Sequence, residues 1–309
     1  MLVQRILTAL VLATVVIAAV FQLPATYFSL FIALVTLGAA WEWLSLTDVD
    51  KMSSRLLFLL ALILPMLGVT YWTVFLEVMS ESLEWPELKD YSDALEWLVI
   101  APVLFWLLTM ILIRHSAPQL LKMQFKPRFQ AFIGWIVLLS AWMFLSKLKA
   151  YYGPVMVLYF LVLIWFADIS AYFVGKKWGK VQLAPEISPG KTLQGMYGAL
   201  ASALVSGLCF YLGGKLFSDD DATTATPDES LWFLDELVSI DIAFLSVLTV
   251  LVSIYGDLFF SLVKRRKGVK DSGRLLPGHG GILDRVDSII AAAPFFYAGI
   301  VLIGRIFYS

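Results

Sequence analysis

A dense mixture of cations, carboxylates and glycines occupies residues 256–287, where one long apolar run ends and the next begins. Within it, a carboxylate, a hydroxyl and two cations follow one another at helical spacing: Asp257, Ser261, Lys264 and Arg265. Positions four, seven and eight residues after the first share one face of a helix, so these groups are expected to form a single polar stripe. Ionised groups beside lipid are costly, which predicts that the stripe serves a function.

The charged stretch continues into a loop and a second helix. Lys270 and Asp271 lie in the loop, followed by a glycine-rich turn in which backbone N–H groups can approach a ligand closely. Beyond it, Asp284 and Asp287 are three residues apart and share one helix face, with Arg285 between them. Acidic residues also stabilise a helix start by about 0.3–1 kcal/mol, an ordinary explanation that accounts for one carboxylate but not for the group.

A second polar segment, SPGKT, directly precedes another apolar run. Its Gly-Lys-Thr resembles part of a nucleotide-binding P-loop, but that motif requires a glycine where Pro185 stands, and no preceding strand is expected. At a helix N-terminus the segment offers two hydroxyls, an ammonium group and free backbone N–H groups, which suit a phosphate: Ser188, Lys191 and Thr192. An ordinary helix cap is the alternative interpretation.

Asp168 lies inside an apolar run, so its carboxylate is expected to face the bundle interior, a cation or water. Carboxylates with retained water suit Mg²⁺, and cations beside glycine backbone suit phosphates. The residues therefore predict a Mg²⁺-phosphate active site that takes one substrate from the cytosol and one from the membrane. Two histidines and one cysteine argue against a zinc site.

The rest of the chain predicts an all-α, polytopic integral membrane helical bundle, because 60% of its residues are hydrophobic and 15% are charged, against about 25% charged in soluble domains. A span needs about 20 apolar residues, and about nine transmembrane helices are expected. They lie near residues 6–22, 27–46, 55–79, 97–113, 131–148, 154–175, 193–217, 241–263 and 286–307. Residues 1–150 would hold the N-terminal membrane helices and 151–309 the catalytic helices with cytoplasmic loops, in one integrated domain.

The distribution of basic residues predicts the orientation in the membrane. With the N-terminus in the cytoplasm, 18 of the 23 Lys and Arg residues lie on the cytoplasmic side, as the positive-inside rule requires. The acidic loop SDDDATTATPDES falls on the opposite side and is expected to be a solvated connector.

The charged stretch resembles the signature of phosphatidate cytidylyltransferase, also called CDP-diacylglycerol synthase. The matching pattern is S-x-x-K-R-x4-K-D-x-G-x3-P-x-H-G-G-x2-D-R-x-D, on Ser261, Lys264, Arg265, Lys270, Asp271, Pro277, His279, Gly280, Gly281, Asp284, Arg285 and Asp287. The helix around Asp168, the SPGKT segment and the triplet Trp41, Glu42 and Trp43 also resemble that family. Members more often carry a second lysine where this chain has Gly190.

The resemblance implies a homodimeric, nine-helix enzyme of the bacterial inner membrane, with its active site on the cytoplasmic side. It would condense CTP with phosphatidic acid to give CDP-diacylglycerol and pyrophosphate, using either Mg²⁺ alone or Mg²⁺ with a second, monovalent or divalent, cation. Nucleic acid is not an expected partner. By the same resemblance Asp257 and Asp284 are metal ligands, with Asp287 or Asp168 as further candidates.

In this reaction the lipid phosphate attacks the α-phosphorus of CTP and pyrophosphate leaves. Catalysis is expected to depend mainly on charge neutralisation and positioning. The predicted neutralising cations are Lys264, Arg265, Lys270 and Arg285, and the predicted phosphate contacts are Ser188, Lys191, Thr192, Ser261, Gly280 and Gly281. Asp271 is a further candidate for the catalytic group. His279 either donates a hydrogen bond to pyrophosphate or is a turn residue, and Glu42 is expected to be a structural partner of a cation.

Two other functions fit a polytopic chain with intramembrane acids. An ion-coupled transporter would use Asp168, Asp257 and Asp287 as coupling sites, although the charges cluster on one side and not near the midplane. A phosphotransferase that consumes CDP-lipids would need a G-x3-D-x3-D run, which the sequence lacks.

Overall fold

The computed structural model describes residues 2–85, 95–217, 236–276 and 280–307. Within them the chain forms α1 (Leu2–Gln22), α2 (Ala25–Leu46), α3 (Met52–Ser82), α4 (Ile100–Lys122), α5 (Pro127–Trp178), β1 (Gln182–Ala184), β2 (Ser188–Thr192), α6 (Leu193–Phe217), α7 (Glu236–Arg266) and α8 (Leu283–Phe307). Seven helices in these residues are long and apolar enough to cross a bilayer. The expected polytopic helical membrane fold is confirmed, whereas the number of spans and the side of the N-terminus stay predictions.

Helix α5 consists of two helices joined at Gly153. Its 52 residues would measure about 78 Å if straight, more than twice the hydrocarbon thickness of a bilayer. Gly153 has a φ of 75°, a left-handed conformation that glycine adopts readily, and Pro154 begins the second half. The expected spans 131–148 and 154–175 therefore lie on either side of this break.

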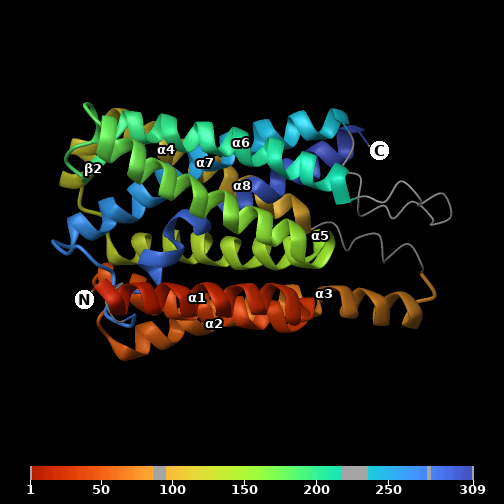
Figure 1. The fold of residues 1–309 in the computed structure, drawn as a ribbon. Coiled ribbons are helices and arrows are strands. Elements are labelled where there is room, and N and C mark those ends of the chain that lie inside the picture. The colour runs from red at the N-terminus through yellow and green to blue at the C-terminus, as the bar shows by residue number, and fades with distance from the viewer. Residues whose placement is uncertain (1, 86–94, 218–235, 277–279, 308–309) are drawn as a thin grey trace.

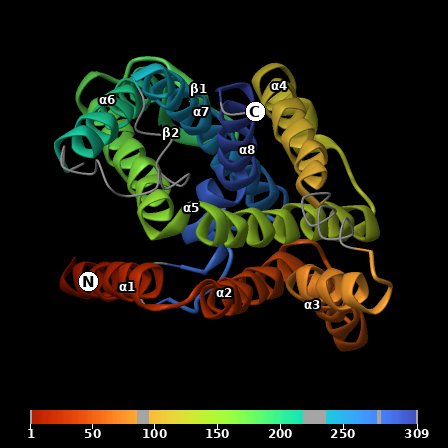
Figure 2. The ribbon, with the colours of Figure 1, turned by 90° about the vertical axis from the view of Figure 1, so that its right-hand side faces the viewer.

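Helix α5 separates two layers of the bundle. Helices α1, α2 and α3 lie on one side of it, and α4, α6, α7 and α8 lie on the other (Figures 1 and 2). The most apolar windows of α7 and α8 are 67% and 61% buried, against 17% in α3. Helices α7 and α8 therefore form the centre, while α3 presents Leu57, Leu60 and Leu64 to lipid.

Trp43 attaches α2 to the centre of the bundle. Its ring is 1% exposed, stacks on Phe259 and meets Phe260 edge-on. Its Nε1 donates to the carbonyl oxygen of Gln130, 3.2 Å away. A side chain at Gly134 would collide with this indole, since a Cβ there would lie 2.0 Å from Nε1. The end of α2 is thereby held against α5 and α7, beside the charged stretch.

The SPGKT segment differs from the expectation. It forms strand β2, which pairs antiparallel with β1, so the expectation that no strand precedes it is wrong, whereas its expected position directly before a helix is confirmed. The hairpin folds around Ile187, which is fully buried and whose N–H donates to Ala184 O at 3.2 Å. A strand forms because this buried side chain anchors the hairpin, and α6 begins immediately after it. The hairpin carries Lys191 toward α7.

Candidate active site

Close packing of α7 on α8 creates the centre of the site. A Cβ at Gly256 would lie 2.2 Å from Ala291 Cβ and 3.5 Å from Asp287 O, so only glycine permits this approach. The next residue, Asp257, is therefore held close enough to Asp287 for the two carboxylates to interact electrostatically. This contact explains the physical use of a Gly-Asp pair within a membrane helix.

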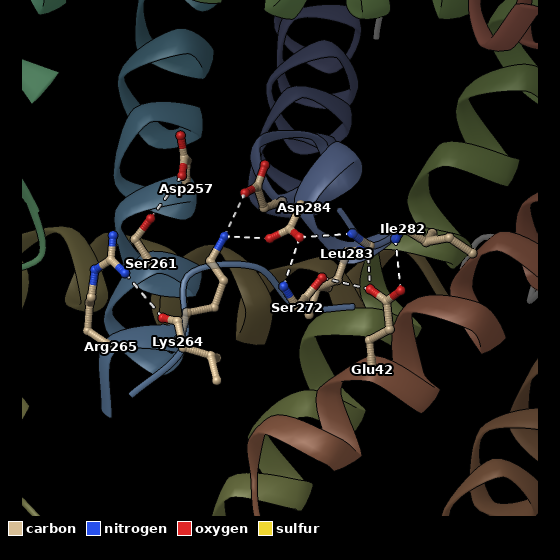
Figure 3. Close-up of polar contacts among 12 residues, drawn as sticks. Glu42, Asp257, Ser261, Lys264, Arg265, Ser272, Ile282, Leu283 and Asp284 are labelled. Atoms are coloured by element: carbon tan, nitrogen blue, oxygen red, sulfur yellow. Dashed lines mark hydrogen bonds and ion pairs between the residues drawn. The ribbon is translucent and has the colours of Figure 1, made fainter. Parts of the chain in front are cut away.

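Lys264 lies between two carboxylates of α8. It is 8% exposed, and its Nζ is 2.7 Å from Asp284 Oδ1 and 3.9 Å from Asp287 Oδ2 (Figure 3). Asp287 is itself 9% exposed. The lysine of the expected polar stripe on α7 therefore points at α8, where it offsets the charge of two acids.

Asp284 is oriented by backbone groups of the preceding loop. Its Oδ2 accepts hydrogen bonds from Ser272 N at 2.8 Å and from Gly281 N at 3.0 Å. Gly280 has a φ of 84°, and a Cβ there would lie 2.8 Å from the same oxygen. Gly280 and Gly281 therefore help to hold Asp284, while its Oδ1 faces Lys264.

Asp257 joins the hairpin to α7. Its Oδ2 lies 2.5 Å from Nζ of Lys191, and its Oδ1 accepts a hydrogen bond from Ser261 Oγ at 3.3 Å. Asp168 on α5 is exposed, and its carboxylate interacts electrostatically with Lys191, Asp257 and Arg285. Asp168 of α5 and Asp257 of α7 therefore both interact with Lys191.

Other candidate residues have contacts of a different kind. Arg265 turns from the stripe toward the hairpin, where its Nε donates to Ile187 O at 3.2 Å. Thr192 caps α6, because its Oγ1 accepts a hydrogen bond from Gly195 N at 3.1 Å, as the helix-cap alternative supposed. Ser188 is half-buried at the far end of β2.

The remaining candidates lie on the surface or outside the described residues. Lys270 and Asp271 are exposed on the loop after α7, and Arg285 is exposed on the first turn of α8. His279 and the expected connector 218–230 lie outside the described residues. Their predicted roles therefore stay predictions.

Glu42 occupies a position that the sequence did not reveal. It was expected to pair with a cation, yet among the described residues its carboxylate forms no salt bridge and is 3% exposed. It accepts hydrogen bonds from Ile282 N at 3.0 Å, Leu283 N at 2.9 Å and Ser272 Oγ at 2.7 Å (Figure 3). N–H groups at the start of α8, which have no partner within the helix, take the place of the expected cation. The sequence signal that could have indicated this role was an acidic residue between two tryptophans within an apolar run.

Comparison with known proteins agrees with the motif. The model of the cytidylyltransferase family matches residues 3–303. The chain is 34% identical over 306 residues to the phosphatidate cytidylyltransferase of Haemophilus influenzae, covering 96% of this chain and 97% of that protein. It is also 34% identical over 300 residues to the phosphatidate cytidylyltransferase of Pseudomonas aeruginosa, covering 96% of each. The match to the Bacillus subtilis phosphatidate cytidylyltransferase is 41% over 149 residues, 47% of each chain. The chain therefore belongs to the cytidylyltransferase family.

Proposed function

We propose that this protein condenses CTP with phosphatidic acid, giving CDP-diacylglycerol and pyrophosphate. The observation that carries the proposal is the convergence of Asp257, Asp284 and Asp287 on Lys191 and Lys264 at the meeting point of α7, α8 and the hairpin. Such a cluster suits anionic substrates that need both a cation and direct contacts to phosphate. Membership of the family favours this reaction over ion-coupled transport and over CDP-lipid phosphotransfer.

The donor chemistry of the cluster fits Mg²⁺. Within the described residues no three His, Cys, Asp or Glu side chains are grouped closely enough to bind a metal alone. Mg²⁺ commonly uses one or two carboxylates and completes its shell with water and substrate phosphates. Asp257 and Asp284 would hold it, with Asp287 or Asp168 available for that ion or a second one. When bound, the ion would neutralise phosphate charge and orient the triphosphate.

The lysines of the cluster are placed to contact phosphate oxygens. Lys191 reaches Asp257 from the hairpin and Lys264 reaches Asp284 from α7, so each ammonium can move a short way toward a bound anion. The lipid phosphomonoester has a second pKa near 6 and is largely dianionic at neutral pH, so it attacks without a general base. The residues therefore act by positioning two anions and offsetting their repulsion.

The setting in the membrane completes the proposal. The site would face the cytoplasm of the bacterial inner membrane, because CTP is cytosolic and 18 of 23 basic residues lie on that side in the expected topology. The lipid substrate would enter from the bilayer. The working unit would be a homodimer, as the resemblance to the family implies.

A transfer assay tests the reaction directly. Purified protein in detergent is incubated with phosphatidic acid and CTP labelled in the α-phosphate, with and without a chelator, and label in the lipid phase is followed. Label that enters lipid only with Mg²⁺ supports the proposal. A folded sample that transfers no label to any of several phosphatidic acid species refutes the assigned substrate pair. CTP labelled in the γ-phosphate is the matched control and should leave the lipid unlabelled.

A further inference from the structure

Glu42 lies at a junction between the N-terminal layer and the loop that carries the candidate ligands. It comes from α2, whereas it contacts Ser272 and Ile282 in the loop before α8 and Leu283, the first residue of α8. A second contact joins the same two regions, because Lys267 at the end of α7 forms an ion pair with Asp48 at the end of α2. The C-terminal end of α2 thus contacts the loop between α7 and α8 near both ends of that loop.

Glu42 and Asp284 divide the donors of this loop between them. Ser272 donates its hydroxyl to Glu42 and its backbone N–H to Asp284. At the other end of the loop, the N–H of Gly281 goes to Asp284, and the next two go to Glu42 (Figure 3). Neither carboxylate can shift without disturbing groups that hold the other.

Two glycines show how closely the loop is fitted around Glu42. A Cβ at Gly281 would lie 2.1 Å from Glu42 Oε2, and a Cβ at Gly273 would lie 2.5 Å from Glu42 Oε1. Both distances are too short for any other residue without movement of the carboxylate. The backbone thus wraps the acid directly, which makes its position sensitive to the charge and shape of that one side chain.

We infer that Glu42 is a positioning residue: its carboxylate fixes the N-terminus of α8 so that Asp284 and Asp287 hold the orientation required for a divalent cation. The inference rests on the proposed function for its link to catalysis. Glu42 itself lies behind the loop, touches Ser272, Ile282 and Leu283, and reaches neither Lys264 nor Lys191. A carboxylate is favoured at this place because a helix N-terminus carries partial positive charge.

The test compares Glu42→Gln with Glu96→Gln. Both changes replace a largely buried carboxylate by an amide of the same shape, but Glu96 binds Tyr297 and Arg305, far from the candidate ligands along α8. In Glu42→Gln the amide NH₂ replaces one carboxylate oxygen and must face the N–H donor of either Ile282 or Leu283, because each of these donates to a different oxygen. Mn²⁺ binding is measured by electron paramagnetic resonance without substrate, and exchange of the Ile282 and Leu283 amides is measured by mass spectrometry.

For Glu42→Gln we expect faster exchange of both amides, at least about tenfold weaker Mn²⁺ binding and a matching rise in the Mg²⁺ concentration for half-maximal transfer. Glu42→Asp should recover part of the affinity, because it restores the charge. Glu96→Gln should leave Mn²⁺ binding unchanged. A Glu42→Gln protein that binds Mn²⁺ within twofold of the wild type overturns the inference, as does equal weakening in Glu96→Gln.

Two further outcomes separate the possible failures. If Glu42→Gln does not accumulate in the membrane, Ser272→Ala replaces it, because it removes one donor to Glu42 and keeps the backbone N–H to Asp284. A smaller loss of Mn²⁺ affinity supports the inference, and wild-type affinity overturns it. If the wild type transfers no label but Glu42→Gln still weakens Mn²⁺ binding, the proposed reaction fails and the positioning role stands.

Discussion

The two ends of α8 carry polar clusters of opposite character. At the C-terminal end a single carboxylate, Glu96, is matched by two donors: Tyr297 OH lies 3.0 Å from one oxygen and Arg305 Nη2 lies 2.9 Å from the other. At the N-terminal end, three carboxylates share two lysines, and the lysine between Asp284 and Asp287 is 3.9 Å from the second of them. In the cluster around Glu96 each carboxylate oxygen has a donor, and we call it the closed cluster. The cluster at the N-terminal end has three carboxylates for two lysines.

The balance between carboxylates and their donors distinguishes a structural polar cluster from a candidate site. A carboxylate whose two oxygens each have one donor needs no further partner, so Glu96 can join α8 to the segment before α4. A cluster with a surplus of carboxylate can take up a further cation, and the proposed Mg²⁺ is an ion that binds oxygen ligands. The predictions below test whether the two ends respond differently to the same kinds of change.

The largest effect is expected when a proposed metal ligand is neutralised. Asp257→Asn keeps the shape of the side chain but removes the charge that would hold Mg²⁺, so transfer should fall by about 10³-fold or more. The measurement is the initial rate of label transfer, normalised to the amount of folded protein in the membrane. A rate within tenfold of the wild type would contradict a metal role for Asp257, and Glu96→Gln serves as the control.

A large loss of stability is expected when the shared lysine is removed. Lys264→Met leaves Asp284 and Asp287 without their buried cation, which costs about 3–5 kcal/mol. Thermal unfolding in detergent is measured with and without Mg²⁺. The variant should gain more stability from Mg²⁺ than the wild type does, because an added cation replaces the lost charge. An equal Mg²⁺ effect in both proteins would show that the ion does not bind between these acids.

A moderate loss of stability, without loss of activity, is expected at the closed cluster. Glu96→Gln exchanges a charged acceptor for a neutral amide opposite Arg305, which costs about 1–3 kcal/mol. Unfolding temperature and transfer rate are measured on the same preparation. If the rate at low temperature falls in proportion to stability, then the two ends of α8 are coupled and the contrast between them is wrong.

The smallest effect is expected at Thr192. Thr192→Val removes the hydroxyl that caps α6 and retains the side-chain shape, so about 1 kcal/mol of stability should be lost. The KM for CTP should stay unchanged if the hydroxyl acts only as a cap. A clear rise in KM with little change in unfolding temperature would instead assign Thr192 to phosphate binding. Thr249→Val, in the buried interior of α7, is a control for hydroxyl removal away from the hairpin.

The helical membrane fold and the group of candidate residues could both be predicted from the sequence, but from different features of it. Long apolar runs identify helices because a bilayer imposes a length and a polarity on them, which is why the break at Gly153 fell between two expected spans. Helical spacing placed Asp257, Ser261 and Lys264 on one face, and in the structure Ser261 binds Asp257 while Lys264 binds Asp284 of α8. Arg265 shares this spacing but contacts the hairpin, because spacing alone does not say which neighbour lies opposite.

By itself, the sequence determined the class of fold, the family and the side-chain chemistry gathered near residues 256–287, because each of these depends on composition, order and local spacing. Only the tertiary structure decided that SPGKT is a strand, that Lys191 meets Asp257 and that Glu42 of α2 holds the start of α8. The contacts of Lys191 and Glu42 join segments that are distant in the chain. They follow from how the helices pack around a glycine contact and a buried tryptophan, and no local pattern encodes such packing.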